Sequence, residues 1–129
     1  MKPVKCTIVD DNPLALDRLE GLLKLTGRTF ITDKWVDPEE AVIHIPEDIP
    51  DLVFLDVEMP GMSGFDVINK LHQAHCFPVF IFVTGFNQYA IKAIKAEAFD
   101  YLIKPVDLDE LNVCLSRLME QKHPYYLLG

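Results

Sequence analysis

Residues 52–56 read Leu-Val-Phe-Leu-Asp, a short apolar run that ends on a carboxylate. The same pattern recurs along the chain, where the polar residues that end apolar runs are Asp10 and Asp11 after Val4–Val9, Thr84 after Val79–Val83, and Lys104 after Tyr101–Ile103. In an open parallel sheet, residues at the carboxyl ends of several strands converge on one crevice even when they are far apart in sequence. The pattern therefore predicts a single site that contains three carboxylates, one hydroxyl and one ammonium group.

The rest of the chain alternates between strand and helix signals, which predicts a doubly wound α/β fold. The predicted strands are Val4–Val9, Thr29–Val36, a short run from Leu52, Val79–Val83 and Asp100–Ile103. The predicted helices run from Asn12-Pro13 to Gly27, from Asp37-Pro38 to a stop at Pro46, onward from Ser63, from Gln88 to Glu97 and from Asp107 to Gln121. Each of these five strands precedes one helix, so the strands should form one parallel sheet with helices on both faces.

The residue types at the strand ends favour phosphoryl chemistry. Three carboxylates at close range repel one another, so they either share protons or hold a cation. A site made only of oxygen ligands favours a hard ion such as Mg²⁺ or Mn²⁺ over Zn²⁺. Because a carboxylate can also act as a nucleophile toward phosphorus, the set suggests phosphoryl transfer to an Asp.

Four segments in this order resemble the receiver domains of bacterial two-component response regulators. They are residues 8–12 (Ile-Val-Asp-Asp-Asn), residues 54–64 (Phe-Leu-Asp-Val-Glu-Met-Pro-Gly-Met-Ser-Gly), residues 82–84 (Phe-Val-Thr) and residues 100–105 (Asp-Tyr-Leu-Ile-Lys-Pro). The likeness extends from about Val4 to Met119 and implies a flavodoxin-like sheet with strand order 2-1-3-4-5. Residues 84–93, which lead into residues 98–101, are similar to the LytTR (LytR/AlgR-like) subgroup, whose receivers precede a DNA-binding domain.

The resemblance implies a role for each acidic residue of the predicted site. Asp56 would be the phosphoacceptor. Mg²⁺, or Mn²⁺ in its place, would be bound directly by Asp11, through a water by Asp10, by Asp56, and by the backbone carbonyl of Glu58. No organic cofactor is implied.

The remaining site residues would recognise the phosphoryl group and pass on the signal. By resemblance, the Thr84 hydroxyl donates to a phosphoryl oxygen, and Gly85 lets the backbone behind it approach the same group. We expect the Lys104 ammonium to pair with Asp56 at rest and with the phosphate afterwards. The resemblance also implies a cis bond before Pro105 and makes Tyr101 a second switch residue, which moves inward with Thr84.

Composition limits the function of this chain. With 129 residues it has the length of one domain, which we divide into a receiver at residues 1–122 and a tail or the start of a linker at residues 123–129. The net charge of -8, without a basic stripe, argues against nucleic-acid binding by these residues. The absence of a long apolar segment or signal-peptide core predicts a cytoplasmic protein that does not bind membranes. Cys6, Cys76 and Cys114 have no metal-ligand spacing and should be reduced thiols.

The partners follow from the resemblance. A sensor histidine kinase would supply the phosphoryl group, and an output domain outside these residues, with a role in transcription, would receive the signal. We also expect self-association on phosphorylation, through the face that carries Lys92, Lys95, Tyr101 and Arg117. The domain would not be an enzyme beyond its own phosphorylation and dephosphorylation.

Two other classes use related chemistry or topology. Phosphatases of the haloacid dehalogenase type also have an Asp nucleophile and Mg²⁺, but they carry an Asp-x-Asp-x-Thr motif after the first strand. In this chain, Asp56 follows the third predicted strand. Flavin-binding modules of similar topology carry a phosphate loop of Ser, Thr and Gly after the first strand. Asp10 and Asp11 stand at that point, and two carboxylates would repel a flavin phosphate.

Overall fold

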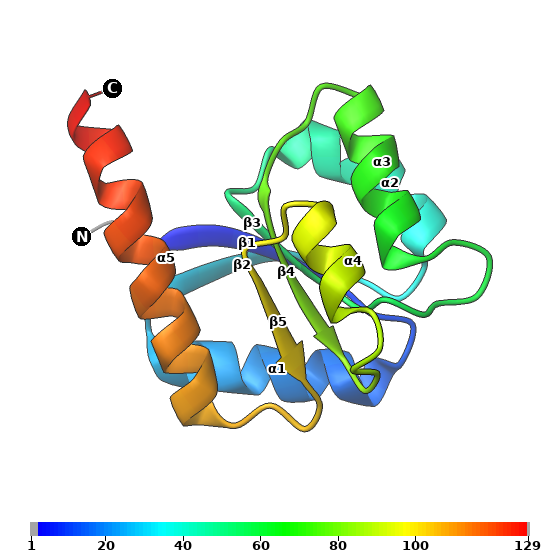
Figure 1. Ribbon diagram of the computed structural model, residues 1–129, viewed down its shortest axis with the longest axis horizontal. Coiled ribbons are helices and arrows are strands. Elements are labelled where there is room, and N and C mark those ends of the chain that lie inside the picture. Colours follow the sequence, from blue (N-terminus) through cyan, green and yellow to red (C-terminus); the bar gives the residue numbers. More distant parts are fainter. Residues whose placement is uncertain (1–2, 129) are drawn as a thin grey trace.

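The computed structural model describes residues 3–128, with side chains to Gln121, and its centre is a five-stranded parallel sheet (Figure 1). The strands are β1 (Val4–Val9), β2 (Thr29–Trp35), β3 (Leu52–Leu55), β4 (Val79–Thr84) and β5 (Asp100–Ile103). Their order across the sheet is β2-β1-β3-β4-β5. The predicted fold class and strand order are confirmed.

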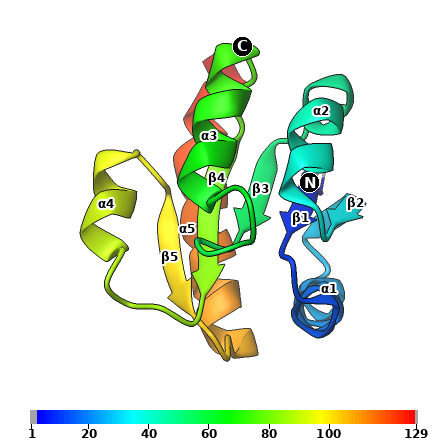
Figure 2. The same ribbon diagram turned by 90° about the vertical axis from the view of Figure 1, so that its right-hand side faces the viewer.

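Five helices cover the two faces of the sheet, and their bounds are α1 (Pro13–Thr26), α2 (Pro38–Asp48), α3 (Gly64–Gln73), α4 (Ala90–Lys95) and α5 (Leu108–Leu128). Helices α1 and α5 lie on one face and α2, α3 and α4 on the other (Figures 1 and 2). Each face has its own apolar core: α1 and α5 bury residues such as Leu23 and Leu115, and the opposite helices bury residues such as Ile45 and Leu71. Because β3 and β4 are covered on both faces, their sequences are almost continuously apolar.

Local sequence signals fix the start of three helices. Asn12 caps α1 by accepting a hydrogen bond from the Leu14 amide at 3.0 Å, and Asp37 caps α2 in the same way. Ser63 begins α3 with a capping box, in which its hydroxyl accepts from the Asp66 amide and the Asp66 carboxylate accepts from the Ser63 amide. These caps satisfy amides that have no partner inside a helix, so the chain turns back along the sheet directly after each strand-end loop.

Three predicted helix bounds are wrong. Pro46 does not stop α2, because the last turn still closes through the Ile49 amide, which donates to the Ile45 carbonyl at 3.0 Å. Helix α4 is shorter than predicted, since the left-handed backbone of Glu97 (φ 61°) ends it and no side chain caps its start. Helix α5 continues past the predicted end at Gln121 to Leu128. Gly129, part of the predicted tail, lies outside the described residues.

Strand β2 forms an edge of the sheet and contains a bulge. Cys6 and Thr7 are adjacent in β1, but they pair with Ile31 and Asp33, so Thr32 is an extra residue in β2. The Thr32 hydroxyl lies near the Thr7 hydroxyl (3.2 Å) and the Cys6 carbonyl (3.3 Å). It also hydrogen-bonds to the Asp48 carboxylate at the end of α2. The bulge therefore attaches β2 to its neighbours through a side chain as well as through the backbone.

The remaining sequence expectations on packing concern the thiols and membrane segments. Cys6, Cys76 and Cys114 are buried free cysteines, as predicted. In the part of the chain that the structure describes, none of the helices has the length and apolarity required to cross a bilayer.

Gly64 is required by a close backbone approach and not by a turn. Gly61 has a positive φ of 82° and does occupy a turn, whereas Gly64 is the first residue of α3. A Cβ atom at position 64 would lie 2.3 Å from the Asp56 carbonyl oxygen and 2.8 Å from the Phe82 ring. The start of α3 thus lies directly against the backbone of Asp56.

We predict that Gly64→Ala destabilises the protein, because the new methyl group must displace either α3 or the Asp56 backbone. The cost should be about 1–3 kcal/mol, the usual range for overpacking. Gly21→Ala in α1 is the matched control, since a Cβ there meets nothing within 4 Å and the substitution should stabilise the helix by about 0.4–1 kcal/mol. Urea unfolding of both variants measures the difference, and equal stabilities would contradict the close packing described for Gly64.

Candidate functional site

Three carboxylates meet at the carboxyl edge of the sheet. Asp10 and Asp11 follow β1 and Asp56 follows β3, and one oxygen from each lies within 4.8 Å of the others. Asp10 and Asp56 are only 5% and 7% exposed, whereas Asp11 is exposed. The structure therefore brings together the acidic residues that the strand-end pattern selected.

Lys104 joins this cluster from the end of β5. Its Nζ atom lies 2.9 Å from Asp56 Oδ2, in the pair expected from the sequence, and 2.6 Å from Asp10 Oδ2, in a pair that was not expected. The Lys104–Pro105 peptide bond is cis, as the resemblance implied. One ammonium thus bridges two buried carboxylates from strands β1 and β3.

Burial and charge act in opposite directions on these groups. Burial raises the pKa of Asp10, hydrogen bonds from Lys104 and the Asn12 amide oppose the change, and the nearby charge of Asp56 adds to it. Burial alone would lower the pKa of Lys104, but its hydrogen bonds to Asp10 and Asp56 outweigh burial, so that the pKa of the ammonium is raised. The ammonium therefore stays charged and partly neutralises the cluster.

The outer oxygens of the cluster are held by the backbone. Asp56 Oδ1 accepts from the Val57 amide at 2.7 Å, and Asp10 Oδ1 accepts from the Asn12 amide at 3.0 Å. These contacts fix both carboxylates with their second oxygens on Lys104. An all-oxygen group of this kind fits a hard divalent cation.

Thr84, at the end of β4, and Tyr101, in β5, both contact Phe86 of the β4–α4 loop. Thr84, the last residue of β4, is fully buried, and its hydroxyl accepts a long hydrogen bond of 3.4 Å from the Phe86 amide. The Tyr101 hydroxyl donates to the Phe86 carbonyl, so Tyr101 is half-buried with its polar end on the β4–α4 loop. Phe86 therefore contacts both residues that the sequence analysis selected as switches.

Glu58, on the loop after β3, has a side-chain partner that the sequence gave no reason to expect. The Tyr89 hydroxyl, at the start of α4, donates to Glu58 Oε2 at 2.8 Å. No periodicity or motif points to this contact, because 31 residues of chain separate its two members. The contact joins the β3–α3 loop to helix α4 across the edge of the site.

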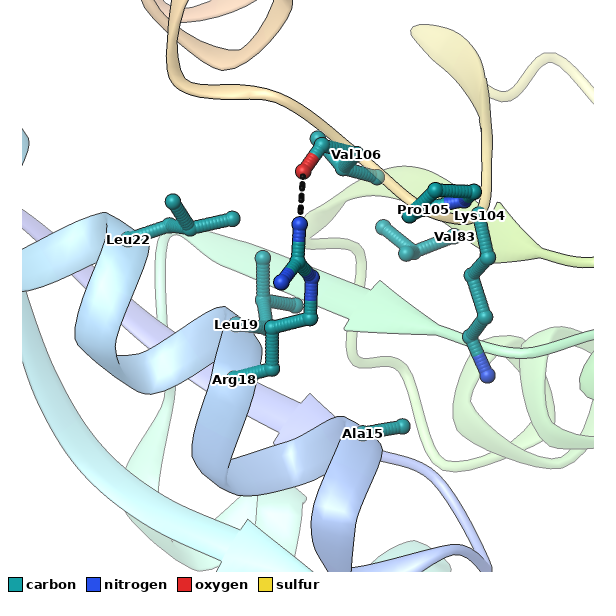
Figure 3. Close-up of a pocket in the computed structure, with 8 residues that line it drawn as sticks. All are labelled: Ala15, Arg18, Leu19, Leu22, Val83, Lys104, Pro105 and Val106. Carbon is teal, nitrogen blue, oxygen red and sulfur yellow. Dashed lines mark hydrogen bonds between the residues drawn. The ribbon is translucent and has the colours of Figure 1, made fainter.

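A pocket of about 320 Å³ opens beside Lys104, between α1 and the loop that follows β5 (Figure 3). Its lining is mainly apolar and consists of Ala15, Arg18, Leu19, Leu22, Val83, Lys104, Pro105 and Val106. The Arg18 guanidinium crosses the pocket and donates to the Val106 carbonyl at 3.2 Å. Arg18 thus connects α1 to the loop that carries Lys104.

The fold and the acidic edge define a class of α/β signalling domain, and comparison with known proteins specifies it. The chain belongs to the response regulator receiver domain family, whose pattern matches residues 6–116. Receiver domains of this family are the signalling domains of two-component systems. This assignment decides against the phosphatase and flavin-binding alternatives.

Relatives with known names support the assignment. The transcriptional regulatory protein BtsR of Salmonella typhi is 38% identical over 119 residues, which are 92% of this chain and 49% of that protein. The sensory transduction protein LytT of Bacillus subtilis is 37% identical over 114 residues, 88% of this chain and 47% of that protein. The chain spans about half the length of the curated relatives it matches. Its likeness to LytT agrees with the LytTR-type subgroup expected from the sequence.

The crystal structure of the response regulatory domain of mrkE from Klebsiella pneumoniae has the same fold. It matches with a TM-score of 0.84 and 26% sequence identity, and the match covers 93% of this chain and 98% of that one.

We predict that Lys104→Met lowers the free energy of unfolding by about 2–4 kcal/mol, because it leaves two buried carboxylates without their cation. Burial already raises the pKa of Asp10 and Lys104 opposes that rise, so without Lys104 the folded-state pKa of Asp10 would lie further above its unfolded value. A folded state that binds an extra proton gains stability as the pH falls. The loss should therefore be smaller at pH 5 than at pH 7.5 in urea unfolding. Lys24→Met is the control, since the Lys24 side chain is 70% exposed and its contact with Glu20 is long, at 3.6 Å. A loss of unfolding free energy that is the same at both pH values would contradict the pairing of Lys104 with the two carboxylates.

Proposed function

We propose that this chain is a phosphoacceptor domain in which Asp56 takes a phosphoryl group from a sensor histidine kinase and thereby controls an output domain. The observation that carries the proposal is the buried Asp56 carboxylate, held by Lys104 inside a three-carboxylate cluster, in a chain of the receiver family. A nucleophile so placed is oriented by its neighbours before any donor arrives.

The acidic cluster fits Mg²⁺, with Mn²⁺ as a substitute. Asp11, Asp10, Asp56 and the backbone carbonyl of Glu58 would hold the ion, and all of them offer oxygen. When bound, the ion neutralises charge on the carboxylates and on the incoming phosphoryl group. The mutual repulsion of three carboxylates within 4.8 Å supports a cation here.

The transfer itself requires little from the protein beyond orientation and charge. A carboxylate oxygen of Asp56 forms a bond to phosphorus while the bond from phosphorus to the kinase histidine nitrogen breaks, and the imidazole leaves with its electron pair and takes up a proton. Lys104 then gains a phosphoryl oxygen as partner. At rest, the Thr84 hydroxyl accepts a 3.4 Å hydrogen bond from the Phe86 amide. Its own proton can therefore be donated to a second phosphoryl oxygen.

The new contacts provide the energy for a switch. Moving an equilibrium from mostly off to mostly on takes about 5.5 kcal/mol of differential stabilisation, and each hydrogen bond to a charged group contributes about 1.5–3 kcal/mol. Because Phe86 contacts both Thr84 and Tyr101, a movement of Thr84 toward the phosphate would release Tyr101 to move inward. This movement would change the face formed by α4, β5 and α5.

The pocket beside Lys104 supports an approach of the kinase over α1. Leu14, which precedes the pocket residue Ala15 in α1, is 79% exposed and would offer the kinase a further apolar contact. A kinase docked here would bring its histidine toward Asp56 past Lys104. The kinase and this domain would meet in the cytoplasm.

The output domain would lie outside these residues, since the chain covers only 49% of BtsR and 47% of LytT. Residues 1–122 would be the receiver and residues 123–129 a tail or the start of a linker, of which residues 123–128 lie in α5. The likeness to BtsR, a transcriptional regulatory protein, supports a DNA-binding output. With a net charge of -8, this chain would leave nucleic-acid binding to that domain.

We expect acetyl phosphate or phosphoramidate to phosphorylate the protein once, at Asp56, and only with Mg²⁺ or Mn²⁺ present. Asp56→Asn should abolish labelling, because an amide is not a nucleophile toward phosphorus. Intact-mass spectrometry measures the outcome, and chelation of the metal is the control. Labelling that persists in Asp56→Asn, or in chelator, would disprove the assigned chemistry.

A phosphoryl mimic should show how the signal leaves the site. Beryllofluoride with Mg²⁺ is expected to shift amide NMR signals on the face of Lys92, Lys95, Tyr101 and Arg117 and to promote dimers. Thr84→Ala should bind the mimic but lose most of those distant shifts. If shifts in the parent protein appear only around Asp56 and the mass stays monomeric, the proposed output route is wrong.

A further inference from the structure

The contact between Glu58 and Tyr89 lies at the edge of the site but outside the acidic cluster. Glu58 is two residues after Asp56, and its carboxylate accepts a 2.8 Å hydrogen bond from the Tyr89 hydroxyl. Among the described residues, the cluster contains the carboxylates of Asp10, Asp11 and Asp56, and Glu58 does not belong to it. The Glu58 side chain therefore points toward α4 although its backbone borders the cluster.

The Tyr89 ring has a defined position, so its hydroxyl is a fixed anchor. It is tilted against Phe65 (6.3 Å between centroids) and packs edge-on to Phe86 (6.3 Å). Phe65 in turn packs on the buried Phe82 ring at 4.8 Å, and the Lys92 ammonium lies 4.5 Å from the Phe65 centroid. Tyr89 is thereby attached to the core, whereas Glu58 is an exposed side chain on a loop.

The hydrogen bond has the character of a neutral hydroxyl donating to a charged carboxylate. A tyrosine hydroxyl has an ordinary pKa of about 10, so it keeps its proton and its donor role at neutral pH. Without the hydrogen bond from Tyr89, the Glu58 carboxylate would be free to rotate over the mouth of a site that already contains three carboxylates.

A fourth carboxylate at this position would repel a phosphodonor, which approaches as an anion. We propose that Tyr89 is a positioning residue of the phosphorylation site, whose hydroxyl holds the Glu58 carboxylate on the α4 side and out of the path of an anionic phosphodonor to Asp56. This inference rests on the proposed function, since it requires that Asp56 be the acceptor. If the negative charge of Glu58 moved to roughly 10 Å from the phosphodonor, at the edge of the protein, the rate of Asp56 phosphorylation should fall about threefold.

The test compares two donors of different charge. Near neutral pH, acetyl phosphate carries about two negative charges, and phosphoramidate, whose nitrogen is protonated, carries about one. Initial rates of Asp56 labelling are measured by intact mass at low ionic strength. Mg²⁺ is kept at a saturating concentration, so that a change in metal affinity does not alter the measured rate. Thermal melting of each variant checks its folding, and Tyr89→Phe retains the ring and its packing.

Tyr89→Phe should slow labelling by acetyl phosphate about threefold and labelling by phosphoramidate less, in line with the charge of each donor. The loss should shrink at high salt. Glu58→Gln should not be slower than the parent, because it removes the charge and keeps the backbone carbonyl. The double variant Tyr89→Phe with Glu58→Gln should match Glu58→Gln alone.

Other outcomes would overturn the inference. An equal loss for both donors, or a loss that persists in the Glu58→Gln background, would mean that Tyr89 acts through structure and not through the Glu58 charge. Unchanged rates in Tyr89→Phe would leave Asp56 as the acceptor and disprove the role of Tyr89. A parent protein that is not labelled at all would instead overturn the proposed function, and this inference with it.

Discussion

The organisation of this protein depends on one ammonium group that bridges two buried carboxylates. Lys104 reaches from the end of β5 to Asp10 after β1 and Asp56 after β3, at 2.6 and 2.9 Å. Without a cation, these two carboxylates would face each other in a poorly hydrated crevice, at a high cost in free energy. Lys104 therefore links three strand ends by charge, because its ammonium contacts carboxylates that follow two other strands.

The site and its surroundings are coupled because the loops that bear the chemistry also contact each other. Thr84, Phe86 and Tyr101 form one connected group, since Phe86 contacts the side chains of the other two through its amide and carbonyl. Gly64 adds a second restraint, since α3 starts directly on the Asp56 backbone. In the proposed function, a change in charge at Asp56 would act on α3 through packing and on the β4–α4 loop through Thr84.

Much of this arrangement can be predicted from the sequence because short apolar strands end on their functional residues. Asp10, Asp56 and Thr84 were selected in this way, and caps such as Asn12 and Ser63 marked the helix starts. Other features depend on three-dimensional packing. Whether Lys104 pairs with one carboxylate or two is decided by side-chain rotamers, and the contact of Tyr89 with Glu58 by how two distant loops pack. Pro46 fails as a stop signal because Ile45 beside it is anchored in the core.

The bulge at Thr32 has a consequence for how this protein behaves among its own copies. Strand β2 is an open edge of the sheet, and its Phe30 is 60% exposed, so a regular strand here would be a template for adding a strand from another molecule. The extra residue interrupts the regular hydrogen-bonding repeat, and Lys34 places a charge on the same strand. Both features oppose the addition of a strand from a second copy of the domain at this edge.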